Sequence, residues 1–257
     1  MRKSKKIVLR YNLSGFNDFF DLFKEKNPIY QLCTTKSSVQ LKTEKYNYLF
    51  TKDYLGIGAI ILFSKVKSDI LKNIKEKNII IPDNIIPTYF AYNPKYFDSH
   101  QGFLMGLTEL DLNSAYLNSA FRLNLISEEI YLKLLSCSKP IRLRALGSIA
   151  TKKDIYEYEN GEMILHTLKK DDLLCNVWKY ICYRTDLEIL DLISENKQDN
   201  FVFYWFDNLF LNLPEHEIRK DKFYKLNFPL DMNYSYMNNN IVVHLDQTDK
   251  TFNFAIK

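Results

Sequence analysis

The sequence contains few of the residues that build tight turns, crosslinks and metal sites. Its 257 residues include only 7 glycines, 7 prolines, 4 cysteines and 4 histidines. The cysteines lie far apart without CxxC spacing, so neither a disulfide framework nor a zinc ribbon is expected, and the thiols should be reduced. The histidines are isolated and show no HxxxH pattern, which argues against a zinc or nucleophilic centre.

Long hydrophobic runs are missing as well. The apolar stretch LGIGAIILF, residues 55–63, is about half of the roughly 18 to 20 residues that a membrane-spanning helix needs, and it reads as a buried strand. The N-terminus begins with basic residues but continues directly into a strand-like alternation, without the apolar segment of a secretory signal. We therefore expect a cytoplasmic protein with no membrane partner.

The composition is that of a folded globular protein. Apolar residues make up 46% of the chain, including 18 tyrosines and 18 phenylalanines, which is enough for a packed core in one large domain or two small ones. The formal net charge of +4 is compatible with a polyanionic partner but does not require one.

Residues 1–98 are predicted to form a small α/β region that carries no catalytic signature. The expected elements are strands at 5–11, 45–51 and 55–63, a helix after Gly15 and a helix from Ser64. Four phenylalanines share one face of the first helix and are expected in the core: Phe16, Phe19, Phe20 and Phe23. Residues 91–103 read as a connecting loop, which places the boundary between the two regions there.

Residues 99–257 are predicted to form an antiparallel sheet packed by helices, so the fold class is α+β. The expected elements are a strand at 105–112, helices from Ser114 and Ser127, a hairpin at Asn160-Gly161, a long helix from Asp171 to about Asn196, and a strand pair turning at Asp207-Asn208. The long helix is expected to bury Leu173, Val177, Ile181, Leu187 and Leu190.

Two aspartates stand at the ends of apolar runs where a buried strand would favour valine. Asp111 lies in ELDLNSAYLNSA, and Asp207, 207 − 111 = 96 residues later, lies in FVFYWFDNLFL. In the predicted sheet, the end of the first strand and the later hairpin turn can lie side by side. Two adjacent carboxylates would repel each other unless a cation sat between them, and Mg²⁺ completed by phosphates and water fits such a pair.

The first of these runs resembles a polymerase motif. DLNSAYLNS resembles the first palm motif of family B DNA polymerases, D-x-x-S-L-Y-P-S. Asp111, Ser114 and Tyr116 stand on signature positions, and Ser119 lies at the end of the same window. The run departs from the signature at Leu117, where the family has proline, and at Ala115, where leucine is usual.

The second run and the segment between the two extend the resemblance. VFYWFDNLFL resembles the third palm motif, Y-x-D-T-D-S, with Asp207 on the second aspartate, although the first aspartate is missing and Asn208 replaces serine. The basic residues from Lys139 to Lys153 lie where the family has its fingers helix, without matching that consensus. The fingers-like insertion would span about residues 121–153.

The resemblance implies a DNA polymerase-like nucleotidyltransferase that uses two-metal phosphoryl transfer. Asp111 and Asp207 would hold Mg²⁺ or Mn²⁺, and the backbone at Ser114 would meet the triphosphate. Tyr116 would lie beneath the incoming sugar, and Arg142 and Arg144 would contact the phosphates. The implied partners are DNA, deoxynucleoside triphosphates and a protein that completes the fingers or thumb. The small size suggests a phage or mobile-element origin, with the host cytoplasm as its location.

Other readings of the same residues stay open. Asp111 could cap the following helix, and Asp207-Asn208 could be an ordinary hairpin turn. The chain could also be a catalytically inactive palm-fold protein that binds nucleic acid or belongs to a virion, or a general nucleic-acid-binding domain with a coincidental motif. Whether it is an enzyme is therefore left open by the residues alone.

Overall fold

The computed structural model of the protein is a mixed α+β structure with two β-sheets and, within the residues it describes, six α-helices. This confirms the predicted α+β class. None of the described helices is long and apolar enough to cross a membrane. The described residues are 7–35, 38–51, 57–97, 101–196, 198–214, 224–246, 248 and 250–255.

The chain forms two compact units, and each takes residues from two separate segments. The first unit comprises residues 1–72 and 140–178, and the second comprises residues 73–139 and 179–257. This division differs from the predicted boundary between residues 98 and 99. Helices α2 and α6 contribute residues to both units.

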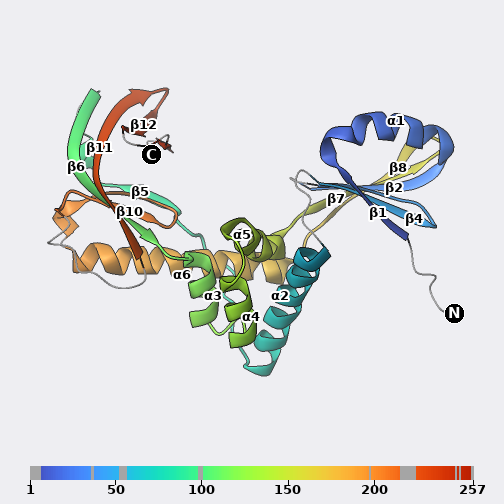
Figure 1. Ribbon diagram of the computed structural model, residues 1–257, viewed down its shortest axis with the longest axis horizontal. Coiled ribbons are helices and arrows are strands. Elements are labelled where there is room, and N and C mark those ends of the chain that lie inside the picture. The colour runs from blue at the N-terminus through green and yellow to red at the C-terminus, as the bar shows by residue number, and fades with distance from the viewer. Residues whose placement is uncertain are drawn as a thin grey trace. The chain divides into compact units, whose positions relative to one another are not determined.

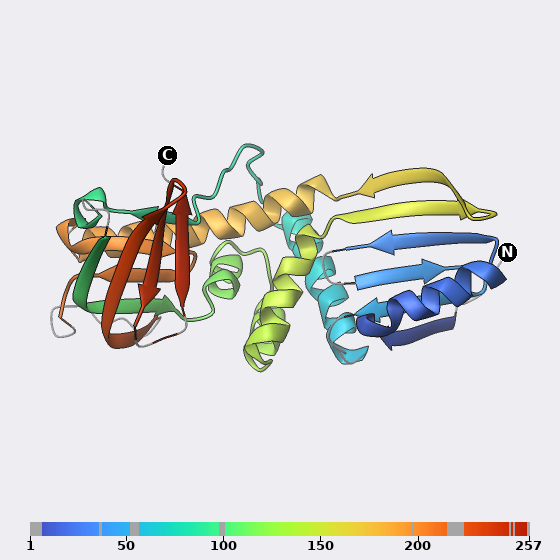
Figure 2. The ribbon, with the colours of Figure 1, turned by 90° about the horizontal axis from the view of Figure 1, so that it is seen from above.

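The first unit is built on a six-stranded sheet with the order β1-β4-β3-β2-β7-β8. Its strands can be followed side by side in Figure 2. All neighbours are antiparallel except β1 and β4, which are parallel. The strands are β1 (Ile7–Asn12), β2 (Ile29–Thr34), β3 (Ser38–Lys42), β4 (Tyr46–Thr51), β7 (Lys153–Glu159) and β8 (Glu162–Lys169).

Helix α1 (Phe16–Lys26) lies across one face of this sheet (Figure 1). The four phenylalanines that share one face of the helix pack against aromatic and aliphatic side chains of the sheet, which confirms that they belong to the core. Phe23 is buried between α1 and the sheet, and its ring makes an edge contact with the ring of Tyr30 at 5.3 Å between centroids. These aromatic contacts hold α1 against the sheet.

The hairpin between β7 and β8 turns at Asn160-Gly161, as predicted. Both turn residues have positive φ, 50° and 85°, which is the conformation of a type I′ turn. Strand β7 pairs with β2 along the whole length of β2, with Ile29 opposite Glu159 and Thr34 opposite Asp154. This pairing is why the segment 140–178 joins the N-terminal sheet instead of the second region.

The predicted strand at residues 55–63 is wrong where the structure describes it. Helix α2 (Ile57–Glu76) begins seven residues before the predicted helix start at Ser64. Its buried residues Ala59, Leu62, Val66 and Ile70 are spaced by three and four positions, as expected for one face of a helix. The short apolar run resembled a strand because its exposed side is apolar too, and periodicity cannot separate the two forms in so short a run.

The second unit is built on a seven-stranded antiparallel sheet with the order β13-β12-β11-β6-β10-β9-β5. Five of these strands are labelled in Figure 1: β5, β6, β10, β11 and β12. The predicted loop at 91–103 is partly wrong, because β5 ends and β6 begins within it. The strands are β5 (Phe90–Tyr92), β6 (Gln101–Leu112), β9 (Phe201–Trp205), β10 (Asn208–Leu211), β11 (Tyr224–Met237), β12 (Asn240–Leu245) and β13 (Thr251–Ala255).

Both faces of this sheet are covered by apolar packing. On one face, Ile189, Leu192 and Ile193 of helix α6 (Asp172–Glu195) pack against Leu110 and Leu112 of β6. The other face carries a cluster rich in aromatic residues from β9 to β13. The prediction for the buried side of α6 was only partly correct, because Leu173 and Leu190 are exposed while Val177 and Ile181 are buried.

The close approach of Tyr234 to Gly102 gives a test of the second unit. The two residues are opposite each other in the β6–β11 pair, and a Cβ at position 102 would lie 2.1 Å from the Tyr234 ring. That ring is buried and packs on Phe97 with 4.9 Å between centroids. We expect Gly102→Ala to lower the free energy of unfolding by about 1–3 kcal/mol through overpacking, measured by chemical denaturation.

The matched control is Gly147→Ala at the end of helix α5 (Lys139–Gly147), because a Cβ there meets nothing within 4 Å. Alanine should leave stability unchanged or raise it slightly at this position. Equal stability of Gly102→Ala and the unsubstituted protein would contradict the packing described for Tyr234.

Candidate functional site

The strand register brings Asp111 and Asp207 to the same edge of the second sheet. Strands β6 and β10 are antiparallel, with Asn208 opposite Asp111. The backbone N–H of Leu112 donates a hydrogen bond to the carbonyl of Asp207 at 3.0 Å. The juxtaposition predicted for the two strand ends is therefore confirmed. The hairpin turn itself lies at Phe206-Asp207, one residue earlier than predicted.

A third carboxylate, that of Glu109, lies on the same strand. Because side chains alternate along a strand, Glu109 and Asp111 point away from the face where Leu110 and Leu112 meet α6. Glu109 is only 1% exposed and pairs with the ammonium of Lys250 at 2.5 Å. A buried carboxylate needs such a partner to remain charged. The negative charge of Glu109 is therefore balanced by Lys250, a residue of the protein itself.

The surroundings of Asp207 oppose its ionisation. Burial raises the pKa of its carboxyl above the usual value, and the negative charges of Asp111 and Glu109 raise it further. The Asp207 backbone N–H and the positive charge of Lys139 act in the opposite direction. In addition, the side-chain amide of Asn208 donates to Oδ1 of Asp207 at 3.3 Å. The pair of aspartates is thus a site where a bound cation would relieve a real electrostatic cost.

The donors at this edge fit a hard cation better than a transition metal. Among the residues that the structure describes, no three histidine, cysteine, aspartate or glutamate side chains come close enough together to hold a metal on their own. Two carboxylates can hold Mg²⁺ or Mn²⁺ when water and substrate phosphates supply the remaining oxygen ligands. Asp111 and Asp207 are the residues that would provide them.

The chain after Asp111 passes through a strained residue into helix α3 (Ala115–Arg122). Ser114 occupies the N-cap position with φ 52° and ψ 39°, a left-handed conformation, and its side chain makes no capping hydrogen bond. The N-cap is therefore Ser114 and not Asp111, against the reading of Asp111 as a helix cap. The left-handed residue turns the helix sharply away from the strand end.

Tyr116 lies beside Asp207. Burial raises the pKa of its hydroxyl well above the usual value, and the charges of Asp207, Cys182 and Asp186 add to this effect. The side chain is half-buried, on the first turn of α3. The structure therefore brings Asp111 and Tyr116 close to Asp207, and Ser114 lies between the two in the segment that links β6 to α3.

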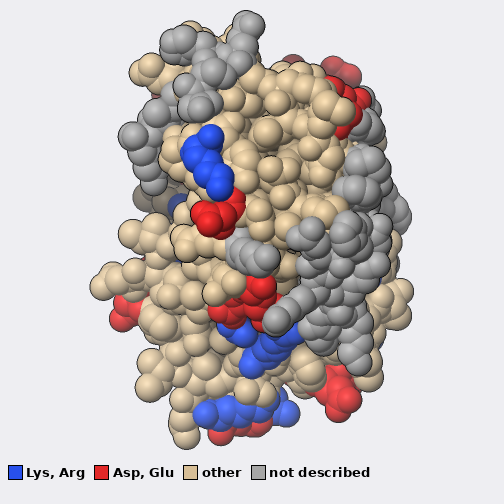
Figure 3. All heavy atoms as spheres, turned by 90° about the vertical axis from the view of Figure 1, so that its left-hand side faces the viewer, with Lys and Arg blue, Asp and Glu red and all other residues tan. Residues whose placement is uncertain are grey.

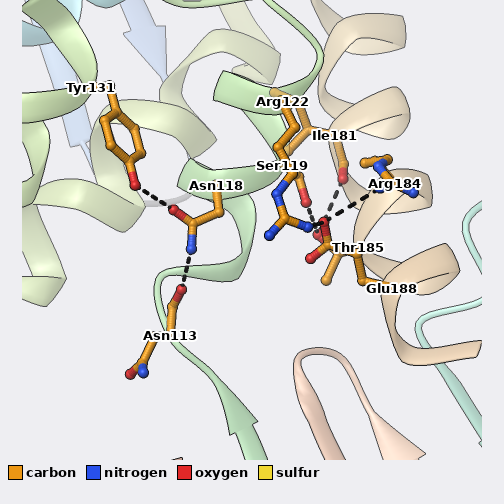
Figure 4. A network of polar contacts seen from close by, with 9 residues as sticks. All are labelled: Asn113, Asn118, Ser119, Arg122, Tyr131, Ile181, Arg184, Thr185 and Glu188. Carbon is orange, nitrogen blue, oxygen red and sulfur yellow. Dashed lines mark hydrogen bonds and ion pairs between the residues drawn. The ribbon is translucent and has the colours of Figure 1, made fainter. Parts of the chain in front are cut away.

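A chain of side-chain hydrogen bonds fixes the turn between β6 and α3 (Figure 4). The amide of Asn118 donates to the carbonyl of Asn113 at 2.6 Å. The hydroxyl of Tyr131, from helix α4 (Glu128–Leu135), donates to the other end of the same amide at 2.8 Å. Asn118 thus has both ends of its side chain occupied and holds the backbone two residues after Asp111.

Helix α3 is also bound to helix α6 by polar contacts (Figure 4). The hydroxyls of Ser119 and Thr185 are 3.0 Å apart in a buried position. Near the surface, the Arg122 guanidinium contacts the Glu188 carboxylate at 2.5 Å, and Arg184 lies 3.8 Å from the same carboxylate. These contacts make α3 and the second half of α6 one support for the residues around Asp207.

Asp186 of helix α6 supports the site from the other side. Its buried carboxylate accepts hydrogen bonds from the backbone N–H groups of Thr88, at 2.8 Å, and Tyr89. The carbonyl of Tyr89 in turn accepts from the N–H of Phe206 at 2.6 Å. Through this short relay, Asp186 holds the residue that precedes Asp207. Burial raises the pKa of Asp186, and the two N–H donors lower it.

The basic segment predicted to face the triphosphate is divided between the two units. Lys139, the first residue of helix α5 (Lys139–Gly147), belongs to the second unit and acts electrostatically on Asp207. Arg142 and Arg144 belong to the first unit. Their assignment to the triphosphate stays a prediction.

Comparison of the chain with protein-family models, with curated proteins and with solved structures found no match.

Reasoning from the sequence missed two residues of the site. Glu109 stands two positions before Asp111, so strand alternation alone would have put it on the same face. Asp186 interrupts an apolar helix face formed by Cys182, Ile189 and Ile193, and a carboxylate at such a position is a recognisable signal. Lys139 was not missed, because the predicted basic segment begins with it.

The raised pKa of Asp207 predicts a pH-dependent effect on stability. The folded protein binds this proton more tightly than the unfolded chain, so stability falls as pH rises through the folded-state pKa. We expect Asp207→Asn, without divalent cations, to raise the Tm at pH 7 by a few degrees. The difference should vanish near pH 3, where the carboxyl is protonated in both states.

The control for this measurement is Asp199→Asn, since the Asp199 side chain is 97% exposed. It should leave the Tm nearly unchanged at both pH values. A lower Tm for Asp207→Asn at pH 7 would contradict the electrostatic description of the site.

Proposed function

We propose that the protein is a metal-dependent nucleotidyltransferase of the DNA polymerase type. The observation that carries the proposal is the meeting of Asp111 and Asp207 at the paired ends of β6 and β10. A pair of half-buried carboxylates, with a mutual repulsion that a divalent cation would relieve, is the kind of site used in phosphoryl transfer. The motif around Asp111, which resembles the first palm motif of family B polymerases, supports the same function.

In this proposal Asp111 and Asp207 hold Mg²⁺ or Mn²⁺. The bound ions would stabilise the charge that develops when a primer 3′-hydroxyl displaces pyrophosphate from the α-phosphate of a nucleotide. The relay from Asp186 through Tyr89 keeps Asp207 in position, and Asn118 does the same for the backbone after Asp111. Positioning of this kind is a large part of catalysis when the protein does no covalent chemistry.

Three further residues are assigned to the substrate. Tyr116, half-buried beside Asp207, would form the floor under the sugar, and the backbone at Ser114 would meet the triphosphate. Lys139 would neutralise part of the phosphate charge, because it already acts on Asp207. Neutralisation of phosphate charge is the role expected from the sequence for the basic segment. Arg142 and Arg144 are further candidates for this role.

The proposed partners are DNA and deoxynucleoside triphosphates. On the side of the protein shown in Figure 3, blue and red side chains lie next to each other on a mostly uncharged surface, and the described residues there form no broad basic patch. Binding of DNA on that side would therefore depend on a few local contacts more than on long-range attraction. A protein partner that completes the fingers or thumb is part of the proposal.

A second candidate function is nucleic-acid binding without catalysis, including a structural role in a virion. The observation in its favour is the small set of metal ligands: among the described residues, only two carboxylates meet at the strand ends, and the surroundings of Asp207 favour its protonated form. A palm-like scaffold that had lost its metals would keep these features.

Primer extension with Mg²⁺ or Mn²⁺ separates the two candidates. We expect incorporation of deoxynucleotides by the unsubstituted protein and a loss of more than about 100-fold in Asp111→Ala and in Asp207→Ala. Asp191→Ala, which removes an exposed carboxylate of α6, is the matched control and should retain full activity. No incorporation on any primer and template, with nucleic-acid binding intact, would favour the second candidate.

The charge of Lys139 gives a test that does not depend on turnover. Lys139 lowers the pKa of Asp207, so Lys139→Gln should raise it. Because a metal binds the deprotonated carboxylate, the pH at which Mn²⁺ binding is half-maximal should move upward in this variant. Calorimetric titration over a series of pH values measures this shift. Lys133→Gln, on α4, is the control, and an unchanged or lower midpoint for Lys139→Gln would exclude the proposed contact.

A further inference from the structure

The left-handed residues that are neither glycine nor asparagine lie around the two aspartates. Among the described residues, eight that are not glycine have positive φ, and five of them are asparagines, which tolerate this conformation. The other three are Ser114, Tyr89 and Phe206, with φ of 52°, 62° and 56°. All three adjoin the site, because Phe206 precedes Asp207, Tyr89 is bonded to Phe206, and Ser114 follows Asp111 by three residues.

For the two aromatic residues this conformation is costly. A bulky side chain at positive φ is a true outlier, and such strain persists only where the surrounding structure enforces it. The enforcing contacts are the hydrogen bond from Phe206 N–H to the Tyr89 carbonyl and the hold of Asp186 on the Thr88 and Tyr89 backbone. The side chain of Tyr89 is also hydrogen-bonded to the thiol of Cys182.

The strain turns an aromatic ring toward solvent beside the carboxylates. The Phe206 side chain is 38% exposed, whereas Phe203 and Phe210 of the same hairpin are fully buried. Its ring lies 5.5 Å from the Tyr89 ring and makes an edge contact with Trp205 at 5.6 Å between centroids. Burial of this ring does not account for the strain, because the ring is partly exposed. A polar turn residue such as asparagine or aspartate would tolerate the positive φ more easily at this position.

We propose that Phe206, backed by Tyr89, is a stacking surface for a nucleobase. The inference rests on the proposed function, since it assigns a further part of the ligand to the same site. A flat ring held rigidly in partial exposure suits the face of a purine or pyrimidine, and such stacking does not depend on the base. Asp207, the proposed metal ligand, directly follows Phe206 in the chain, and Lys139 acts on Asp207.

The base could belong to the incoming nucleotide or to the end of a DNA strand. Both offer the same aromatic face, and two probes distinguish them. The first probe is dATP with Ca²⁺, which allows binding without turnover, and the second is a single-stranded thymidine decamer without nucleotide. The intrinsic fluorescence of Trp205, whose ring touches Phe206, and calorimetry both report binding.

Three substitutions test the ring itself. Phe206→Leu keeps an apolar side chain but removes the aromatic face, and we expect about 5- to 150-fold weaker binding of at least one probe. Phe206→Tyr keeps the face and should retain the affinity. Phe103→Leu removes another exposed phenylalanine of the same unit and should change nothing. Equal melting temperatures of the Leu and Tyr variants establish that the loss comes from the ring and not from unfolding.

The outcomes separate this inference from the proposed function. Weaker binding in Phe206→Leu, rescued in Phe206→Tyr, supports the stacking surface even if no primer is extended. Unchanged affinity of Phe206→Leu for both probes overturns it, even if extension depends on Asp111 and Asp207. If the unsubstituted protein binds neither probe, the inference is also overturned.

Discussion

The antiparallel pairing of β6 with β10 is the constraint on which the rest of the site depends. It places Asn208 opposite Asp111 and ties the carbonyl of Asp207 to the backbone of the neighbouring strand. The backbone hydrogen bonds force two carboxylates together that would otherwise separate, and burial makes their repulsion stronger than it would be in water. The apolar packing of α6 against Leu110 and Leu112 stabilises this arrangement from behind.

The structure around the pair consists of rigid supports and a few strained residues. Asn118 and Tyr131 hold the turn after Asp111, while Asp186 holds the segment that grips Phe206. The buried contacts of α3, α6 and the sheet offset the free-energy cost of the left-handed residues. Strain that gathers at one place and is enforced from several sides is typical of sites selected for geometry and not for stability.

Much of this site could be predicted from the sequence, because it follows from local patterns. Asp111 and Asp207 each end an apolar strand, and the hairpin signals are short-range. The partner of the β7–β8 hairpin could not be predicted, since pairing with β2 depends on contacts across more than a hundred residues. Strand β11 was missed although apolar residues alternate along it from Tyr224 to Tyr236, which is a strand signal; Pro229 in its middle is the one residue that argues against a strand. The left-handed aromatic residues follow from tertiary contacts alone.

The most direct measurement of the central claim is a crystal structure of the protein grown with Mn²⁺ and a deoxynucleoside triphosphate. The account predicts an anomalous scattering peak between the carboxylates of Asp111 and Asp207, with carboxylate oxygens at about 2.1–2.2 Å, and triphosphate oxygens completing the coordination. Well-ordered aspartates with no peak between them, or Mn²⁺ bound only elsewhere, would contradict it.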